Sequence, residues 1–202
     1  MLKVLYEDNH IIAAFKPARV LSQGDKTGDA DMLSEVKKYL KEKYKKSGNV
    51  FVGLLHRLDR PVSGVMLFAK TSKGASRLSE QFRNREVQKM YHALVVGRPQ
   101  NPSGTIVSQV EGQAAVLHYQ LIKPGKQYSL LKISIEGGKY HQIRVQLSGA
   151  GWPIVGDGKY GGEKWAHKGS IALCATGLSF TAATVDKRVD LAIDIPPELL
   201  DN

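Results

Sequence analysis

Short apolar segments recur along the chain, each bounded by charged or turn-forming residues, and this pattern predicts a strand-rich fold. Their lengths and their content of Val, Ile, Leu and Phe are typical of buried or half-buried β-strands. The pattern predicts strands at residues 11–15, 65–69, 91–96, 115–122, 129–135, 170–175 and 189–195.

Helical periodicity is confined to a few segments. Asp31 can cap a helix that continues to about residue 46, with apolar residues on one face and lysines on the other. A second helix is predicted over residues 73–85. Residues 142–147 fit either period, and we interpret them as a short helix that directs Arg144 inward. The predicted class is α/β of the α+β type, with a mixed, mostly antiparallel sheet flanked by helices and loops.

Two segments rich in Gly, Asp, Asn and Ser, at residues 23–30 and 101–104, predict loops rather than linkers. Neither isolates a segment large enough to form a core of its own. With 202 residues, 42% of them hydrophobic, the chain can build one substantial core. We therefore expect a single domain over residues 1–202.

The net charge of the chain indicates a class of binding partner. The formal net charge is +10, which suits a polyanion, because neutralising phosphates and releasing their counterions supplies most non-specific nucleic-acid affinity. A basic protein can also be merely well solvated. The lysines of the first predicted helix are interpreted as a solvated face that could contact phosphate.

Cysteine and histidine usage excludes several classes of site. Cys174 is the only cysteine, so no internal disulfide is possible, and its apolar neighbours predict a core position in a strand. The six histidines are scattered without a tight metal-binding pair, so we expect no metal and no other cofactor. The N-terminus has no long apolar run, which predicts neither a signal peptide nor a membrane span and favours a cytoplasmic location.

One short segment contains a carboxylate between two arginines, which makes it the strongest candidate for catalysis. Asp59 lies between Arg57 and Arg60, with apolar residues on both sides at 51–55 and 65–68. The turn that carries Asp59 is therefore predicted to join two buried strands. Neighbouring guanidinium groups keep such an aspartate ionised and available as a nucleophile. The alternative is a purely structural Asp–Arg pair at a strand end.

Three separated blocks of residues resemble one family. The string HRLDRPVSGVMLFAKT, residues 56–71, is similar to the signature of the RluA-type pseudouridine synthases, which isomerise uridine within RNA. The block KMYHALVVG, residues 89–97, and the block GKYHQIRVQL, residues 138–147, follow in the order of that family. The second of these is continued by GWPIVGD at 151–157 and by Tyr160 and Gly161.

The resemblance implies roles for individual residues. Asp59 would be the catalytic residue, Arg57 would take part in flipping out the target base, and Tyr91 would lie beside the uracil and could help to remove the C5 proton. Arg144 would hold the Asp59 carboxylate through a charge-assisted pair. His56, Arg57, Arg60 and Lys89 are the expected substrate-binding residues, although His56 and His141 can also be interpreted as structural hydrogen-bonding groups.

The resemblance extends from about residue 5 to about residue 195, which implies a catalytic domain without an RNA-binding domain ahead of it. The implied partner is ribosomal or transfer RNA, with no metal, cofactor or membrane, and we expect a monomer. The carboxylate could attack C1′, add to C6 of the ring, or take the C2′ proton, and the sequence leaves these three mechanisms open.

Departures from the family and competing functions are few. Ala18 and Arg19 stand where a glycine often follows Lys-Pro, Val62 replaces a usual threonine, and Gln146 replaces a frequent histidine. Alternative functions are a non-catalytic RNA-binding protein that keeps the fold, or a glycosidase or nucleosidase, which would need a second acid near Asp59. Asp157, between two glycines, is interpreted as a turn-former rather than as that acid.

Overall fold

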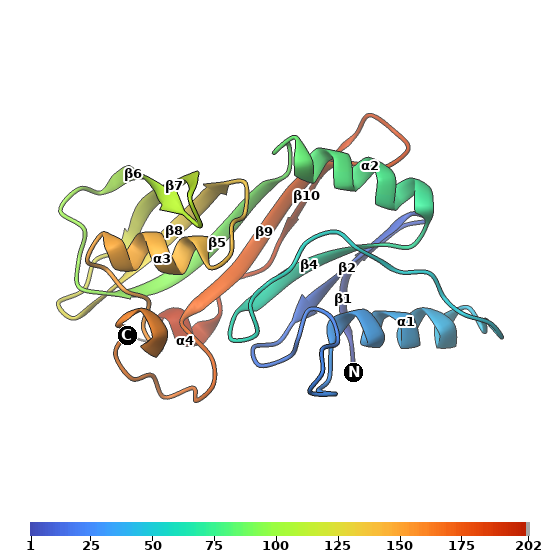
Figure 1. Cartoon of the computed structure of the whole chain (residues 1–202), viewed down its shortest axis with the longest axis horizontal. Coiled ribbons are helices and arrows are strands. Elements are labelled where there is room, and N and C mark those ends of the chain that lie inside the picture. The colour runs from blue at the N-terminus through green and yellow to red at the C-terminus, as the bar shows by residue number, and fades with distance from the viewer. Residues whose placement is uncertain (201–202) are drawn as a thin grey trace. The chain divides into compact units, whose positions relative to one another are not determined.

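In the computed structural model, which describes residues 1–200, the apolar segments form a mostly antiparallel, ten-stranded sheet accompanied by helices (Figure 1). The elements follow in the order β1(Lys3–Glu7), β2(Ile11–Lys16), α1(Met32–Lys43), β3(Gly53–Leu54), β4(Ser63–Ala69), α2(Ser72–Arg83), β5(Gln88–Val96), β6(Ser103–Val110), β7(Gln113–Lys123), β8(Tyr128–Glu136), α3(Gln142–Gly149), η1(Gly158–Tyr160), β9(Leu173–Thr181), β10(Arg188–Ala192) and α4(Pro197–Leu200). The predicted α+β class is confirmed.

The chain divides into two compact units. Unit 1 comprises Met1–Val87 and Ser179–Leu191, and unit 2 comprises Gln88–Leu178 and Ala192–Asn202. Strand β9 contributes residues to both units. Each unit has its own portion of the sheet and is described separately below.

Unit 1 is built on β2 and β4, which pair antiparallel from Ile11↔Ala69 to Lys16↔Gly64. Strand β1 pairs with the other edge of β2, and β3 pairs with β4. Residues 11–14 and 65–69 are completely buried, as their apolar runs predict. Helix α1 begins at Asp31, whose carboxylate accepts a hydrogen bond from the Ser34 amide at 3.0 Å, and α2 packs against β3 and β4.

Glu7 anchors the end of β1 in unit 1 through a cluster of cations. Its carboxylate accepts hydrogen bonds from Lys70 at 2.6 Å, Lys43 at 2.7 Å and Tyr44 at 2.7 Å. Burial alone would raise the pKa of Glu7, but these hydrogen bonds outweigh it and lower the pKa to about 2. Among the lysines of the first predicted helix, Lys43 thus bonds within unit 1, and the others are exposed, as the solvated-face interpretation predicts.

Unit 2 contains an antiparallel meander in the order β5-β8-β7-β6, with the first part of β9 beside β5. Helix α3 packs against β6 and β7 (Figure 1). Buried Gln146 fixes this packing, because its amide donates to the carbonyls of Ile106 at 3.1 Å and Ala115 at 3.0 Å. The residue that departs from the family pattern here therefore has a structural function.

Several predicted boundaries are wrong. The loop predicted at 101–104 overlaps β6, which begins at Ser103 and was not predicted because its apolar residues are few and partly exposed. The first helix ends at Lys43 rather than at 46, the strand predicted at 170–175 runs from Leu173 to Thr181, and the last strand ends at Ala192. Strands β1 and β3 were also missed, since both are short and only partly buried.

Within residues 1–200, no helix is long and apolar enough to cross a membrane. Cys174 is buried in β9, as predicted.

Candidate active site

Asp59 lies in unit 1 on the segment between β3 and β4, which we call the Asp59 turn, residues 57–62. The segment before it is less regular than predicted, because only Gly53 and Leu54 form a strand and Phe51 is half exposed. The turn closes with a hydrogen bond from the Val62 amide to the Asp59 carbonyl at 3.0 Å. Asp59 itself is partly exposed.

The backbone on both sides of Asp59 is fixed from outside the turn. The Ser22 hydroxyl donates to the Leu58 carbonyl at 2.7 Å and accepts from the Leu58 amide at 3.0 Å. On the other side, the Arg19 amide donates to the Arg60 carbonyl at 2.7 Å. Preorganisation of this kind holds a catalytic group in one geometry before the substrate binds.

Lys16 lies beneath the Asp59 turn as a completely buried cation. Its ammonium donates to the carbonyls of Val62 at 2.7 Å, Pro17 at 3.1 Å and Arg60 at 3.2 Å. Burial lowers the pKa of Lys16 to about 8, while the Asp59 carboxylate acts to raise that pKa and Arg60 acts to lower it. Lys16 is therefore still protonated at neutral pH, and its charge attracts the Asp59 carboxylate.

The arginines that flank Asp59 are both exposed, and they are placed differently from one another. Arg60 forms an ion pair with Asp29 at 2.7 Å, and its Nε donates to the Arg19 carbonyl at 3.2 Å. Arg19 has φ +74, a left-handed conformation that glycine adopts more readily than a residue with a Cβ atom. Arg57 is exposed on the surface of the turn, and its assignment to substrate binding stays a prediction.

His56 is held by structural contacts. Its Nε2 accepts a hydrogen bond from the Leu67 amide in β4 at 3.0 Å, and its ring stacks on Phe82 of α2 at 5.1 Å. These contacts agree with the structural interpretation of His56. Its assignment to substrate binding stays a prediction.

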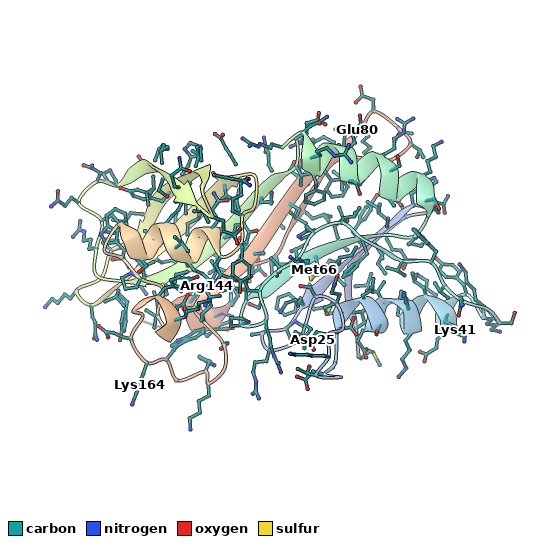
Figure 2. All side chains as sticks on the ribbon, in the orientation of Figure 1. Asp25, Lys41, Met66, Glu80, Arg144 and Lys164 are labelled. Carbon is teal, nitrogen blue, oxygen red and sulfur yellow. The ribbon has the colours of Figure 1, made fainter. Side chains whose placement is uncertain are left out.

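Arg144 lies in unit 2 on α3 and points toward the loop that contains η1, as predicted for an inward-directed side chain (Figure 2). Its Nε donates to Asp157 Oδ2 at 2.6 Å and its Nη2 to Asp157 Oδ1 at 2.8 Å. Both side chains are buried, with 7% and 1% of their surfaces exposed. This bidentate pair satisfies one side of the guanidinium and fixes its plane.

A histidine and a tyrosine complete the surroundings of this guanidinium. Arg144 Nη1 lies 2.9 Å from His141 Nε2, and His141 Nδ1 lies 2.8 Å from the Tyr160 hydroxyl. The Tyr160 ring also faces the guanidinium carbon at 5.0 Å. We call Asp157, His141 and Tyr160 together the Arg144 cradle.

The loop that presents the cradle is closed tightly around Asp157. The Asp157 amide donates to the Ile154 carbonyl at 3.1 Å, and the amides of Tyr160 and Gly162 donate to the Asp157 carbonyl at 3.0 and 2.9 Å. A Cβ atom at Gly162 would overlap the Ile154 carbonyl and lie 2.7 Å from the Asp157 nitrogen. Only glycine therefore fits at position 162.

Tyr91 and Lys89 both lie on β5 of unit 2. Tyr91 is buried, with 8% of its surface exposed, and pairs across the sheet with Ile133 of β8. The Lys89 ammonium donates to the Gly137 carbonyl, on the segment that leads into α3. Lys89 thus stabilises the approach to α3, and its predicted contact with substrate remains a prediction.

Sequence reasoning missed three residues of these two regions. Lys16 could have been found as a lone lysine at the end of an apolar strand, since a buried lysine needs specific acceptors. Asp157 does form the predicted turn, but the turn-former interpretation was incomplete because its carboxylate also pairs with Arg144. Tyr160 was quoted as part of a motif without a role. No local signal connects Asp157 and Tyr160 with Arg144.

The chemistry available from these groups is that of a carboxylate and of fixed cations. Among residues 1–200, no group of three or more His, Cys, Asp or Glu side chains is arranged to hold a metal ion. Asp59 supplies a group that can act as nucleophile or base, Lys16 supplies a nearby positive charge, and the cradle holds Arg144 in one orientation.

Known structures share this fold. The structure of human RNA pseudouridylate synthase domain containing 4 matches 98% of this chain and 90% of its own, with a TM-score of 0.82 at 22% identity. The structure of human RNA pseudouridylate synthase domain containing 1 matches 98% of this chain and 86% of its own, with a TM-score of 0.74 at 21% identity. At such identities the likeness establishes the fold.

Sequence relatives carry the comparison further. The ribosomal large subunit pseudouridine synthase D of Zymomonas mobilis is 30% identical over 98% of this chain and 70% of its own length. Synthase D of Pseudomonas aeruginosa is 32% identical over an aligned region that covers 80% of this chain and 54% of that protein. The model of the RNA pseudouridylate synthase family matches residues 10–149. The chain therefore belongs to the RNA pseudouridylate synthase family.

Proposed function

We propose that this protein isomerises uridine to pseudouridine in ribosomal large-subunit RNA, with Asp59 as the catalytic carboxylate. The observation that carries the proposal is the similarity to a ribosomal large subunit pseudouridine synthase over 98% of the chain. The Asp59 turn supports it, because that turn presents a partly exposed carboxylate on a backbone fixed by Ser22, Arg19 and Lys16.

The reaction needs few groups. The N1–C1′ bond breaks, the uracil turns within the site, C5 bonds to C1′, the proton on C5 is lost, and N1 takes up a proton. Atoms are conserved and no electrons are exchanged with a partner. In each of the three possible mechanisms the carboxylate of Asp59 must be ionised and close to the nucleotide. The buried Lys16 cation favours that charge state.

The other side chains take the roles that the resemblance gives them. Arg57, exposed on the Asp59 turn, fills the space left by the extruded base, because a base inside RNA structure must be flipped out before chemistry. Arg144 stabilises the charge of the catalytic carboxylate, and Tyr91 lies beside the uracil. Arg60, His56 and Lys89 contact the RNA. The protein would act as a monomer in the cytoplasm, with residues 1–202 forming one catalytic domain and without a cofactor.

Tritium release tests the proposal. RNA labelled at C5 of uridine, isolated from cells that lack the protein, loses tritium when wild type forms pseudouridine. Asp59→Asn should lower the release rate by about a thousandfold or more, because the reacting group itself is lost. RNA affinity, measured by filter binding, should stay within a few-fold, because it rests mainly on Lys and Arg.

Two controls make the result specific. Asp186→Asn removes an exposed carboxylate of unit 1 and should leave the rate unchanged. Transfer RNA serves as the second substrate pool. Release from transfer RNA alone would redirect the proposal to that substrate, and equal rates for Asp59→Asn and wild type would refute the role of Asp59.

A further inference from the structure

His141 is placed so that only one protonation state suits its neighbours. An arginine side chain can donate hydrogen bonds but cannot accept them. The contact of 2.9 Å between Arg144 Nη1 and His141 Nε2 therefore requires an unprotonated Nε2. In neutral histidine the proton must then be on Nδ1, from which it is donated to the Tyr160 hydroxyl at 2.8 Å.

The backbone gives a second, independent observation. His141 has φ +56, a left-handed conformation that is unfavourable for a residue with a Cβ atom. Although His141 occupies the N-cap position of α3, its side chain makes no capping hydrogen bond. Capping therefore does not explain the strained conformation, which instead turns the imidazole toward Arg144 and Tyr160. Strain of this kind is concentrated at functional sites.

Aromatic rings hold the imidazole in this orientation. The Tyr140 ring stacks on it with centroids 3.8 Å apart and planes at 19°, and the Tyr160 ring meets it edge-on at 5.6 Å. The two contacts restrict rotation of the imidazole. His141 is thus fixed by its backbone, by two rings and by two hydrogen bonds.

Charged groups lie close to His141 on more than one side. Arg144 contacts it directly, and the Lys159 ammonium lies over the rings of Tyr140 at 5.7 Å and Tyr160 at 5.5 Å. The Asp157 carboxylate accepts hydrogen bonds from Nε and Nη2, on the other side of the Arg144 guanidinium, and in the proposed function the Asp59 carboxylate is a second anion near Arg144. A proton on Nε2 would place a cationic imidazole against the Arg144 guanidinium, with two N–H groups directed at each other.

We propose that His141 is a positioning residue that aims Arg144 only as the neutral Nδ1–H tautomer, so that acid inactivates the enzyme by releasing one corner of the guanidinium. The inference rests on the proposed function, in which Arg144 supports the catalytic carboxylate. Asp157 fixes the plane of the guanidinium, and His141 fixes its rotation about the Asp157 contact.

A pH profile of single-turnover tritium release tests this role. Wild type should lose activity toward acid pH as His141 is protonated. His141→Gln offers an amide oxygen in place of Nε2 and cannot be protonated, so it should retain most activity at neutral pH and lose the part of the acid decline that His141 causes. His141→Ala should be slower by about 10- to 100-fold, the value of one hydrogen bond to a charged group, at unchanged RNA affinity.

His118→Gln is the matched control, because His118 is an exposed histidine of β7, outside the Arg144 cradle, that contacts Glu136 at 3.2 Å. This variant should keep the acid decline of wild type. An acid decline that is the same in wild type and in His141→Gln would overturn the inference while leaving the proposed function intact.

Nitrogen-15 NMR of the histidine rings gives a readout that needs neither activity nor a folded variant at position 141. The His141 signals should show a protonated Nδ1 and an unprotonated Nε2 at neutral pH. Tyr160→Phe removes the acceptor for Nδ1–H and should shift the Nδ1 signal. A protonated Nε2 at neutral pH would overturn the inference. The predicted tautomer in a protein that releases no tritium would instead refute the proposed function.

Discussion

At the Asp59 turn the contacts that fix the chain are made mainly to backbone groups, whereas at the Arg144 cradle they are made between side chains. Lys16 and Ser22 bond to carbonyls and an amide around Asp59. Asp157 and His141 bond instead to the guanidinium itself. The contacts at the Asp59 turn therefore fix the backbone from which the Asp59 side chain extends, whereas the cradle fixes the orientation of the Arg144 guanidinium itself.

This difference predicts different sensitivities. Lys16, beneath the Asp59 turn, has a lowered pKa and loses its proton in mildly alkaline solution. The contacts of the Asp59 turn are therefore expected to change as the pH rises. In the proposed arrangement the cradle needs an unprotonated His141, so it is expected to be disrupted as the pH falls. It also needs the loop that positions Asp157, so it is sensitive to the shape of that loop. Substitutions can be chosen to affect one region without the other.

The largest effect on stability is expected from Gly162→Ala. The added methyl group would overlap the Ile154 carbonyl, which is backbone and cannot move aside without opening the loop around Asp157. Overpacking of this kind costs about 3 kcal/mol, and more when the backbone must shift. Chemical denaturation should show the loss, and tritium release should fall with it because the Arg144 cradle is displaced.

Gly158→Ala is the control for this loop. Gly158 lies in η1, four residues earlier, and a Cβ atom there would have no heavy atom within 4 Å. Its stability and activity should match those of wild type. A Gly162→Ala protein as stable and as active as Gly158→Ala would show that the loop does not set the position of Asp157.

Lys16→Met tests the cation beneath the Asp59 turn through the pH dependence of stability. With a pKa of about 8 in the folded protein, against 10.5 for a lysine in water, Lys16 binds fewer protons when folded than when unfolded between these pH values. Its burial penalty is therefore complete below pH 8 and disappears as the pH rises to 10.5. The free energy of unfolding of wild type should rise relative to Lys16→Met by about 3 kcal/mol over this range.

The same variant should release tritium at least about tenfold more slowly at pH 7, because three carbonyls of the Asp59 region lose their shared donor. Lys26→Met, at an exposed loop position, serves as the control and should follow wild type in both measurements. If the difference in unfolding free energy between wild type and Lys16→Met does not change with pH, Lys16 is not a buried cation.

The fold was largely predictable, because its central strands are apolar enough to be recognised without their partners. The segments around β2, β4, β5 and β8 supply completely buried positions, and their periodicity reflects that burial. β6 was missed because its side chains alternate between exposed and half-buried positions for most of its length. Its place is set by pairing with β7, which is a non-local contact that the local pattern does not contain.

The candidate site divides in the same way. Asp59 and Arg144 could be selected from their own segments, and Arg144 is buried as expected. Lys16 and Asp157 could not be connected with them, because the contacts join residues far apart in the chain or separated by a loop of special geometry. Glycine at 162 and the left-handed backbone at His141 determine these contacts, and neither conformation is encoded by hydrophobic periodicity.

The smallest effect is expected where the Asp59 turn carries its own exposed ion pair. Arg60 and Asp29 contact each other at 2.7 Å with nearly half of each side chain exposed, so the pair contributes between about 0 and 1 kcal/mol. Asp29→Asn should therefore leave the free energy of unfolding almost unchanged, in contrast to Asp157→Asn, which breaks a buried pair.

If Arg60 contacts phosphate, removing its competing carboxylate should strengthen RNA binding about twofold at low salt, and the gain should disappear at high salt because exposed charges are screened. Filter binding at two salt concentrations measures this, and a weaker complex at low salt would show that Asp29 holds Arg60 in its RNA-binding orientation, as Asp157 does for Arg144.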